Sequence, residues 1–499
     1  MELEVSGKDC SGLSAEGRDE WNRELSKIEV YGGTEEEKSV FYTSLYRTFE
    51  RMININEYGK YYSPYDRAVH DTERNIYTDD WIWDTYRAAH PLRAIIDRKS
   101  EEDMINSFIR MTMESEEKWM PTFPEITGDS HRMNGNHAVA VILDGYRKGL
   151  RGFDVDSAYM FCRNALLHKS LLPWTRQPLT DLDMFYHDSL YFPALNPGES
   201  ETCPFVDPSE RRQAVAVTLG HSYDSWCLSE LASETGHKED IDLFRRYASA
   251  YKNLFNNGTG FFHPKNSDGK FIEPFDYRFS GGMGARDYYD ENNGWTYRWN
   301  CQHDIPGLIN LMGGEEKFAE DLDATFREPL GLSKYEFYSK LPDQTGNVGQ
   351  FSMANEPSLH IPYLYDYCGQ PWKTQKRIRT LLSQWFRNDL MGVPGDEDGG
   401  GMSAFVVFSM MGFYPVTPGI PEYAIGSPVF ERIVIHLENG KTFEVIAKNN
   451  SAENIYIRSA ALDGRKLERP FISHEEIMSG GTMVLEMDNR PNMSWGSEK

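Results

Sequence analysis

Cysteines and long apolar runs are scarce in this sequence, and each shortage excludes a class of protein. The 499 residues include only 6 cysteines, widely spaced and without a CxxC or Cys/His group, so a zinc site is not expected. No apolar run reaches the length of about 18 residues that a membrane-spanning helix needs. The opening residues lack the apolar core of a signal peptide, and the sequence indicates no compartment.

Positive charge is also in short supply, because 52 basic residues face 77 acidic ones and leave a net charge of −25. Such a chain repels nucleic-acid phosphates and anionic membranes, so neither partner is expected. The acidic excess is compatible with a neutral substrate and a bound divalent cation, and equally with solubility alone. Aromatic residues make up 13%, and such rings either fill the core or stack on sugars.

Helical periodicity dominates residues 35–419, and residues 1–34 are polar and mixed, as in a linker or the remnant of a preceding domain. About twelve helices would fill the central length, which favours a barrel of paired helices, although a helical solenoid has the same periodicity. The clearest amphipathic stretches are NHAVAVILDGYRKGL, VAVTLGHSYDSWCLSELASETG, EDIDLFRRYASAYKNLF and WKTQKRIRTLLSQWF.

The pattern changes in residues 420–499, where apolar and polar residues alternate around Asn-Gly and Asp-Gly turns. These are hairpin signals, so we predict a small antiparallel β-sandwich portion. We expect such a sheet to need more strands than this chain supplies.

Three polar clusters lie between the helical patterns, where catalytic groups are often displayed. They are residues 290–297 (DENNGWTY), 355–360 (NEPSLH) and 394–404 (PGDEDGGGMSA). Cleaving a glycosidic bond needs a carboxylic acid to protonate the departing oxygen and a second carboxylate to activate water. Glu291 near Trp295 suits the acid, because desolvation raises a carboxyl pKa, and Asp396 and Asp398 suit the base.

Each cluster also has a structural interpretation. Glycine-rich acidic loops are often solvated turns, and the 394–404 stretch lacks the spacing of an EF-hand calcium loop. Asn355 and Glu356 precede a proline, which is typical of a helix start. Residue types and spacing alone therefore indicate only a helical protein with acidic loops.

The same stretches resemble a known family, glycoside hydrolase family 92, over about residues 35–430. The motifs that carry the resemblance are FYTSLYR, WIWDTYRAAHPL, MNGNHAVAVILDGYRKG, HSYDSWC, ENNGWTYRW, NEPSLHIPYLYDYCGQPWKTQ and GDEDGGGMSAFVVFSMMGFYPVTPG. The resemblance implies a mainly α fold, an (α/α)6 barrel packed against β-sandwich strands. It also implies calcium-dependent exo-hydrolysis of α-linked mannose, α-1,2 being the expected linkage, with inversion.

The resemblance further assigns roles by position. It makes Glu291 the general acid and Asp398 the base, with Asp396 in support. It also implies a Ca²⁺ ion that holds sugar hydroxyls, with oxygen ligands expected from the metal-binding candidates Asn355, Glu356 and Thr296. The residues expected to contact the sugar are Trp83, Asp84, Arg87, Trp295 and His360.

The chain departs from the family pattern at several positions. Asn292 replaces the usual glycine, Thr296 the usual glutamine and Leu359 a histidine, and we expect Leu359 to remove a polar group near the entrance. Most of the family's N-terminal β-sandwich is absent from this chain, so that domain is a possible missing partner. Two alternative functions remain open: a non-catalytic mannose-binding remnant, and another (α/α)6 glycosidase or phosphorylase.

Overall fold

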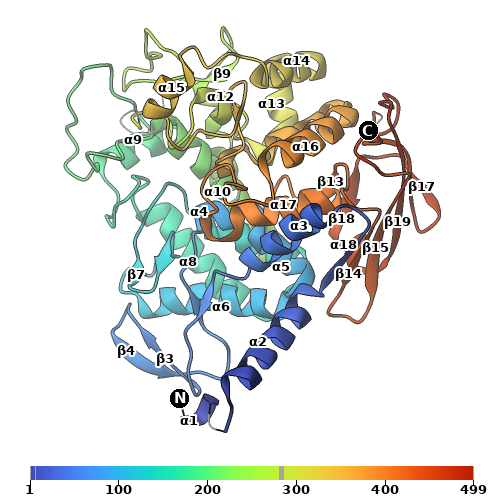
Figure 1. Cartoon of the computed structure of the whole chain (residues 1–499). Helices are drawn as coiled ribbons and strands as arrows, with labels where there is room; N and C mark the ends of the chain where they lie inside the picture. Colours follow the sequence, from blue (N-terminus) through green and yellow to red (C-terminus); the bar gives the residue numbers. More distant parts are fainter. Residues whose placement is uncertain (1, 6, 280–285, 498–499) are drawn as a thin grey trace.

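The computed structural model describes residues 2–5, 7–279 and 286–497, and helices are its main regular element (Figure 1). The α-helices are α1 (Glu2–Val5), α2 (Cys10–Leu25), α3 (Glu35–Arg47), α4 (Ile82–Thr85), α5 (Ala89–Ile96), α6 (Arg98–Glu114), α7 (Ala138–Arg147), α8 (Val155–His168), α9 (Asp181–Ser189), α10 (Ala214–Thr235), α11 (Ile241–Ala248), α12 (Gly294–Tyr297), α13 (Ile305–Met312), α14 (Glu315–Thr325), α15 (Lys334–Lys340), α16 (Pro371–Trp385), α17 (Gly401–Met411) and α18 (His474–Met478). The 3-10 helices are η1 (Ala250–Leu254), η2 (Gln302–Asp304), η3 (Glu356–Ser358), η4 (Ile361–Cys368) and η5 (Asp398–Gly400).

The strands fall into one large sheet, one small sheet and several two-stranded ribbons. They are β1 (Ile28–Tyr31), β2 (Ile53–Asn54), β3 (Lys60–Ser63), β4 (Ala68–Asp71), β5 (Tyr77–Thr78), β6 (Pro124–Glu125), β7 (Gly128–Asp129), β8 (Phe255–Asn256), β9 (Phe261–Phe262), β10 (Asn347–Val348), β11 (Phe351–Ser352), β12 (Phe413–Tyr414), β13 (Glu422–Ile425), β14 (Arg432–His436), β15 (Thr442–Lys448), β16 (Tyr456–Leu462), β17 (Arg465–Leu467), β18 (Phe471–Ser473) and β19 (Gly481–Asp488).

The helices form a closed ring of pairs. Helices α5, α7, α10, α13 and η4 each contact the outer helix that follows along the chain, namely α6, α8, α11, α14 and α16. Helix α17 completes the inner set and closes the ring, because it contacts both α3 and α5. The inner helices α5 and α17 are buried at every position, as expected for helices surrounded by others. The prediction of an (α/α)6 barrel is confirmed.

The C-terminal strands pack on this barrel as a six-stranded sheet in the order β1-β14-β15-β19-β16-β17. All its pairings are antiparallel except β15 with β19, which is parallel. One continuous apolar cluster joins the sheet to the barrel, with Ile433 and Val445 on the sheet side and Phe405 and Phe408 on α17. The β-strand region predicted for residues 420–499 therefore shares the core of the barrel.

The N-terminal segment, residues 1–34, contains regular structure. Residues 1–34, predicted as a linker or remnant, contain helix α2 and strand β1. Strand β1 pairs with β14 through four residue pairs and supplies an edge strand from within the chain itself. Sequence periodicity does not reveal this pairing, because its partners lie some four hundred positions apart. Within the described residues, no helix is both long and apolar enough to cross a membrane.

Candidate active site

The polar clusters lie on short elements that lead into the inner helices. Element α4 precedes α5, α12 precedes α13, η3 precedes η4, and η5 precedes α17. Contacts of α4 with η5, and of α12 with η3, bring these elements together at one end of the barrel. Gly395 lets two of the segments approach closely, since a Cβ there would lie 2.4 Å from the carbonyl oxygen of Ala354.

Three carboxylates converge at this end, and we name them the barrel-end cluster: Asp84, Glu356 and Asp398. One carboxylate oxygen from each lies within 4.8 Å of the others. Asp84 and Glu356 are only 4% and 0% exposed, and neither Glu356 oxygen has a hydrogen-bond partner among the described residues. Burial, together with the charges of Asp398 and Asp84, raises the pKa of Glu356 well above its usual range.

Glu291 faces the same cluster. Its Oε2 accepts a 2.6 Å hydrogen bond from Asn355 Nδ2, next to Glu356 in the chain. Burial, followed by the charges of Asp290 and Asp343, raises the pKa of Glu291 to about 8. The carboxylate of Glu291 in turn helps to raise the pKa of both Asp84 and Glu356.

The three acids of the DEDGGG loop have different surroundings. Glu397 is the N-cap of η5, and its carboxylate accepts hydrogen bonds from the backbone N–H groups of Gly400 (2.9 Å) and Ser403 (3.2 Å), where η5 passes into α17. Asp396 is exposed, whereas Asp398 belongs to the barrel-end cluster. Burial, then the charge of Asp396, raises the pKa of Asp398 to about 6. The structure thus brings Asp396, Asp398 and Glu291 to one site.

Two charged residues that the sequence did not indicate also lie here, Arg286 and Asp343. Arg286 Nη1 bonds Glu210 at 2.6 Å and Asp290 at 3.0 Å. Its Nη2 lies 3.6 Å from Asp343 and 3.9 Å from Glu291. No recognisable motif surrounds Asp343, although the i, i+4 spacing of Arg286 and Asp290 is a detectable signal for that pair.

The predicted sugar contacts Trp83, Arg87 and His360 lie beside the cluster. The Arg87 guanidinium stacks on the Trp83 ring at 5.3 Å, and both side chains are buried. Arg87, His360 and Glu356 line one small cavity. Burial lowers the pKa of His360 to about 4, and its Nε2 is bonded to the Trp299 carbonyl oxygen at 2.8 Å, so His360 is neutral.

The remaining predicted residues lie close by in the chain. Thr296 Oγ1 and Asn355 Oδ1 are buried oxygens that have no hydrogen-bond partner in the described part of the chain, as are the carboxylate oxygens of Glu356. The Trp295 ring packs edge-on against Phe261, with centroids 5.0 Å apart. Leu359 was expected near the entrance, but it is 0% exposed and belongs to the apolar core, since an apolar side chain there is more stable away from water.

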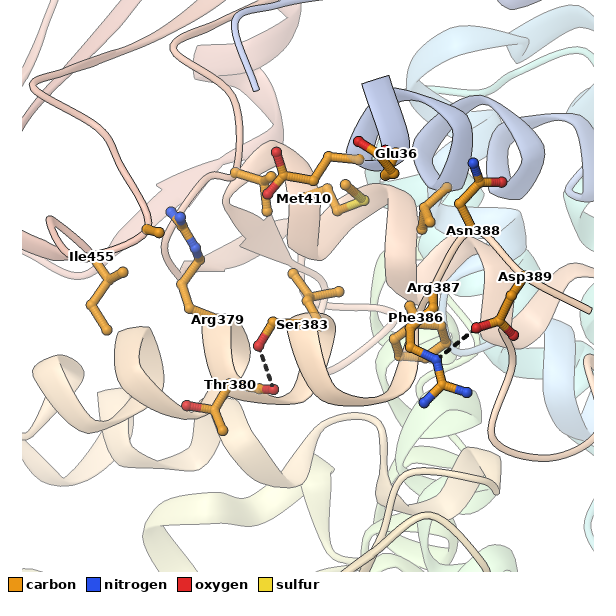
Figure 2. A pocket seen from close by; sticks show the side chains of 15 residues that line it. Glu36, Arg379, Thr380, Ser383, Phe386, Arg387, Asn388, Asp389, Met410 and Ile455 are labelled. Atoms are coloured by element: carbon orange, nitrogen blue, oxygen red, sulfur yellow. Dashed lines mark hydrogen bonds and ion pairs between the residues drawn. The ribbon is translucent and has the colours of Figure 1, made fainter. Parts of the chain in front are cut away.

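A larger cavity of about 550 Å³ lies elsewhere, between α3 and α16 (Figure 2). It is lined partly by apolar side chains, among them Val40, Leu382 and Phe386. None of the predicted site residues lines it. Cavity size therefore does not lead to the residues predicted from the sequence, whereas the converging carboxylates of the barrel-end cluster belong to three of them.

Comparisons with known proteins agree with this geometry. The model of the glycosyl hydrolase family 92 catalytic domain matches residues 1–489. A family GH92 α-mannosidase from Bacteroides thetaiotaomicron, solved with mannoimidazole, is 28% identical with a TM-score of 0.88, over 99% of this chain and 62% of that one. A family GH92 inverting mannosidase from Bacteroides thetaiotaomicron VPI-5482 is 34% identical with a TM-score of 0.85, over 100% and 65%.

An uncharacterized secreted glycosidase from Arthroderma benhamiae is 28% identical over 405 residues, which is 76% of this chain and 48% of that protein. The chain thus spans about half the length of this curated relative and less than two thirds of the two solved chains. The family model covers nearly every residue and includes all the motifs at the barrel end. The chain belongs to glycosyl hydrolase family 92.

Proposed function

We propose that the chain is a calcium-dependent, exo-acting α-mannosidase that removes terminal α-linked mannose from glycans with inversion. The observation that carries the proposal is that Asp398 shares one cluster with the buried carboxylates of Asp84 and Glu356, and that Glu291 is hydrogen-bonded at 2.6 Å to Asn355, the residue before Glu356. The similarity to solved α-mannosidases, one bound to mannoimidazole and one inverting, supports mannose as the substrate. For the linkage we propose α-1,2.

We assign the acid role to Glu291 and the base role to Asp398. Burial and the charges of Asp290 and Asp343 raise the pKa of Glu291, which favours the protonated carboxyl that can donate to the departing glycosidic oxygen. With a pKa of about 6, Asp398 is mostly ionised at that pH and can accept a proton from water. Water then bonds to the anomeric carbon as the glycosidic bond breaks, and attack from the opposite face inverts the configuration. Asp396 supports the base by helping to hold the water.

The donor set fits a calcium ion. Ca²⁺ prefers oxygen ligands, and Asn355, Glu356 and Thr296 each present a buried oxygen that has no partner. When bound, the ion would supply positive charge and a grip on sugar hydroxyls. We assign substrate binding to Arg87, which is stacked on Trp83, and to Asp84, whose carboxylate belongs to the barrel-end cluster.

The test is to incubate the full chain with α-1,2-mannobiose, with Ca²⁺ and with a chelator. We expect calcium-dependent release of mannose, with the β-anomer formed first in a proton NMR time course. Release of the α-anomer first would contradict inversion, and cleavage only with added phosphate would indicate a phosphorylase. Mannose binding without turnover at any enzyme concentration would indicate the non-catalytic alternative.

A further inference from the structure

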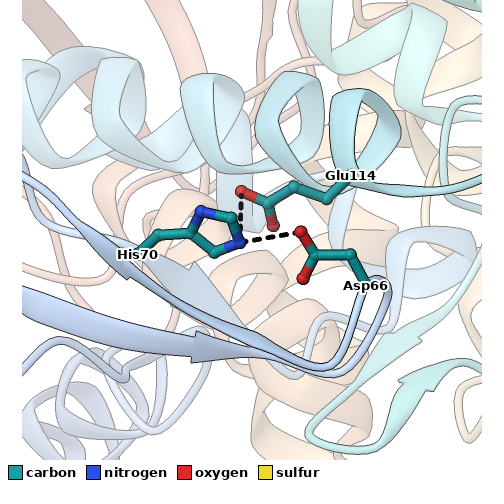
Figure 3. A group of neighbouring side chains, drawn as sticks. All are labelled: Asp66, His70 and Glu114. Atoms are coloured by element: carbon teal, nitrogen blue, oxygen red, sulfur yellow. Dashed lines mark hydrogen bonds and ion pairs between the residues drawn. The ribbon is translucent and has the colours of Figure 1, made fainter.

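A second group of side chains of metal-binding types is separate from the barrel-end cluster, and we name it the hairpin cluster: Asp66, His70 and Glu114. Asp66 lies in the turn between β3 and β4, His70 is on β4, and Glu114 ends helix α6 (Figure 3). One ligand atom from each lies within 4.8 Å of the others. The cluster links the β3–β4 hairpin to an outer helix of the barrel.

Both carboxylates approach the same ring nitrogen. His70 Nε2 lies 2.8 Å from Asp66 Oδ2 and 3.8 Å from Glu114 Oε1. One N–H forms a near-linear hydrogen bond with only one acceptor, so a proton on Nε2 cannot form a strong hydrogen bond with both carboxylates. Glu114 Oε1 already accepts a hydrogen bond from the Tyr61 hydroxyl, and a cation among the three atoms would give both carboxylates and the ring nitrogen one shared partner.

His90 provides an internal contrast, because it also has two carboxylates as neighbours. In that buried triad each ring nitrogen has its own partner: Nε2 bonds Asp80 at 2.9 Å and Nδ1 bonds Glu101 at 2.8 Å. That arrangement suits a doubly protonated imidazole. Among the ion pairs of the described histidines, only His70 has two carboxylates at one nitrogen.

Neighbouring groups hold the three ligands in place. The Tyr61 ring stacks on His70 with centroids 5.4 Å apart, and its hydroxyl donates to Glu114. The Ala68 N–H donates to Asp66 Oδ1 at 3.1 Å, which leaves Oδ2 for the cluster. Such outer contacts orient metal ligands in proteins.

The surroundings leave space for further ligands. Asp66 and Glu114 line a cavity of about 590 Å³, together with the backbone and side chains of the adjacent turn. The Tyr65 hydroxyl, in the same lining, is buried and has no hydrogen-bond partner among the described residues. Water in this cavity can complete the coordination of an ion held by three protein ligands.

We propose that Asp66, His70 and Glu114 bind a divalent transition-metal ion of the zinc class. An imidazole ligand favours zinc, cobalt or nickel over calcium, which prefers oxygen. Ligands bonded to one zinc ion at about 2.1 Å lie roughly 3–4 Å apart, so the observed spacing needs only small side-chain movements. The site ties the hairpin to α6 and is independent of the proposed mannosidase activity.

The test is calorimetric titration of Zn²⁺ into the full chain, stripped with chelator and then saturated with Ca²⁺ to occupy the barrel end. We expect the His70→Gln variant to bind Zn²⁺ at least about 100-fold more weakly than the unmodified chain. His436→Gln is the matched control, because His436 is exposed and has a single carboxylate neighbour, Glu29, at 3.2 Å. This control should bind Zn²⁺ as the unmodified chain does.

A second variant and a spectroscopic signal distinguish loss of the metal site from misfolding. Asp66→Asn changes an exposed turn residue and should weaken binding at least about 10-fold while the circular dichroism spectrum is unchanged. Visible absorption of bound Co²⁺ should appear in the unmodified chain and in His436→Gln, and disappear in His70→Gln. Equal Zn²⁺ affinity in His70→Gln, or no binding by the unmodified chain at 1 mM Zn²⁺, would overturn the proposal.

Discussion

The barrel-end cluster and the hairpin cluster contain similar acids in opposite environments. At the barrel end all the donors are oxygens, two of the three residues are buried, and the Glu356 carboxylate has no hydrogen-bond partner. In the hairpin cluster the ligands are partly exposed, and Glu114 is already bonded by Tyr61 and lies 3.3 Å from Arg110. Buried like charges need an external cation or a proton, whereas the hairpin ligands are stable without one. An ion should therefore control activity at the first site and only local order at the second.

The most severe test removes the base from the barrel-end cluster. We expect Asp398→Asn to lower kcat on α-1,2-mannobiose by about 10³-fold or more, because the amide cannot accept a proton from water. Steady-state kinetics measure this loss, and calorimetry should show that mannose still binds. Asp389→Asn, in an exposed loop, is the matched control and should retain full activity. If Asp398→Asn keeps a kcat close to that of the unmodified chain, Asp398 is not the base.

The proton donor should show a dependence on the leaving group. We expect Glu291→Gln to lower kcat on the disaccharide by about 10²–10⁴-fold, and far less on an aryl mannoside whose leaving group needs no proton. The ratio of the two rates is the measurement. If the natural disaccharide is cleaved at an unchanged rate, Glu291 is not the acid.

Measuring the Ca²⁺ and Zn²⁺ responses of the same variants tests whether the two clusters are independent. Glu356→Gln removes a charged oxygen from the barrel-end cluster, and we expect the half-saturating Ca²⁺ concentration for activity to rise about 100-fold. Its Zn²⁺ affinity should be unchanged, and His70→Gln should show the reverse pattern. Loss of both affinities in either variant would mean that the clusters are not independent.

The smallest expected effect is the pH dependence of kcat/KM. Activity should fall as pH rises through about 8, because Glu291 loses the proton it must donate. It should also fall as pH drops through about 6, because Asp398 becomes protonated and cannot act as a base. Saturating Ca²⁺ should move the acidic limb lower, since a cation favours the carboxylate. A flat profile between pH 5 and 9 would contradict these assignments.

Sequence alone predicted the parts of the molecule that depend on local pattern. Helical periodicity located α7, α10, α11 and α16, although α10 is buried on nearly all sides rather than amphipathic, and the motifs identified the family and the barrel. The loop containing Glu291 and the loop containing Asp398 were recognised because their residue types and order are distinctive. The structure brings these loops to one end of the barrel.

Long-range placement could not be predicted in the same way. Asp343 lies in an ordinary loop, and only folding brings it within 3.6 Å of Arg286. The scarcity of cysteine argued against zinc, but that argument does not cover a site made of one histidine and two carboxylates. Such a set joins a hairpin to a helix more than forty residues away and leaves no compact motif in the sequence.

Ring closure by α17 has a consequence for how the chain becomes an enzyme. The segment that carries Asp398 leads directly into α17, which meets α3 and α5, so Asp398 reaches Asp84 on α4 only when the last inner helix docks against the first part of the barrel. If the proposed roles hold, a partly opened chain would keep its proton donor, Glu291, and lack its base. Hydrolytic activity would then depend on the docking of α17, and it would be lost before the outer helices unfold.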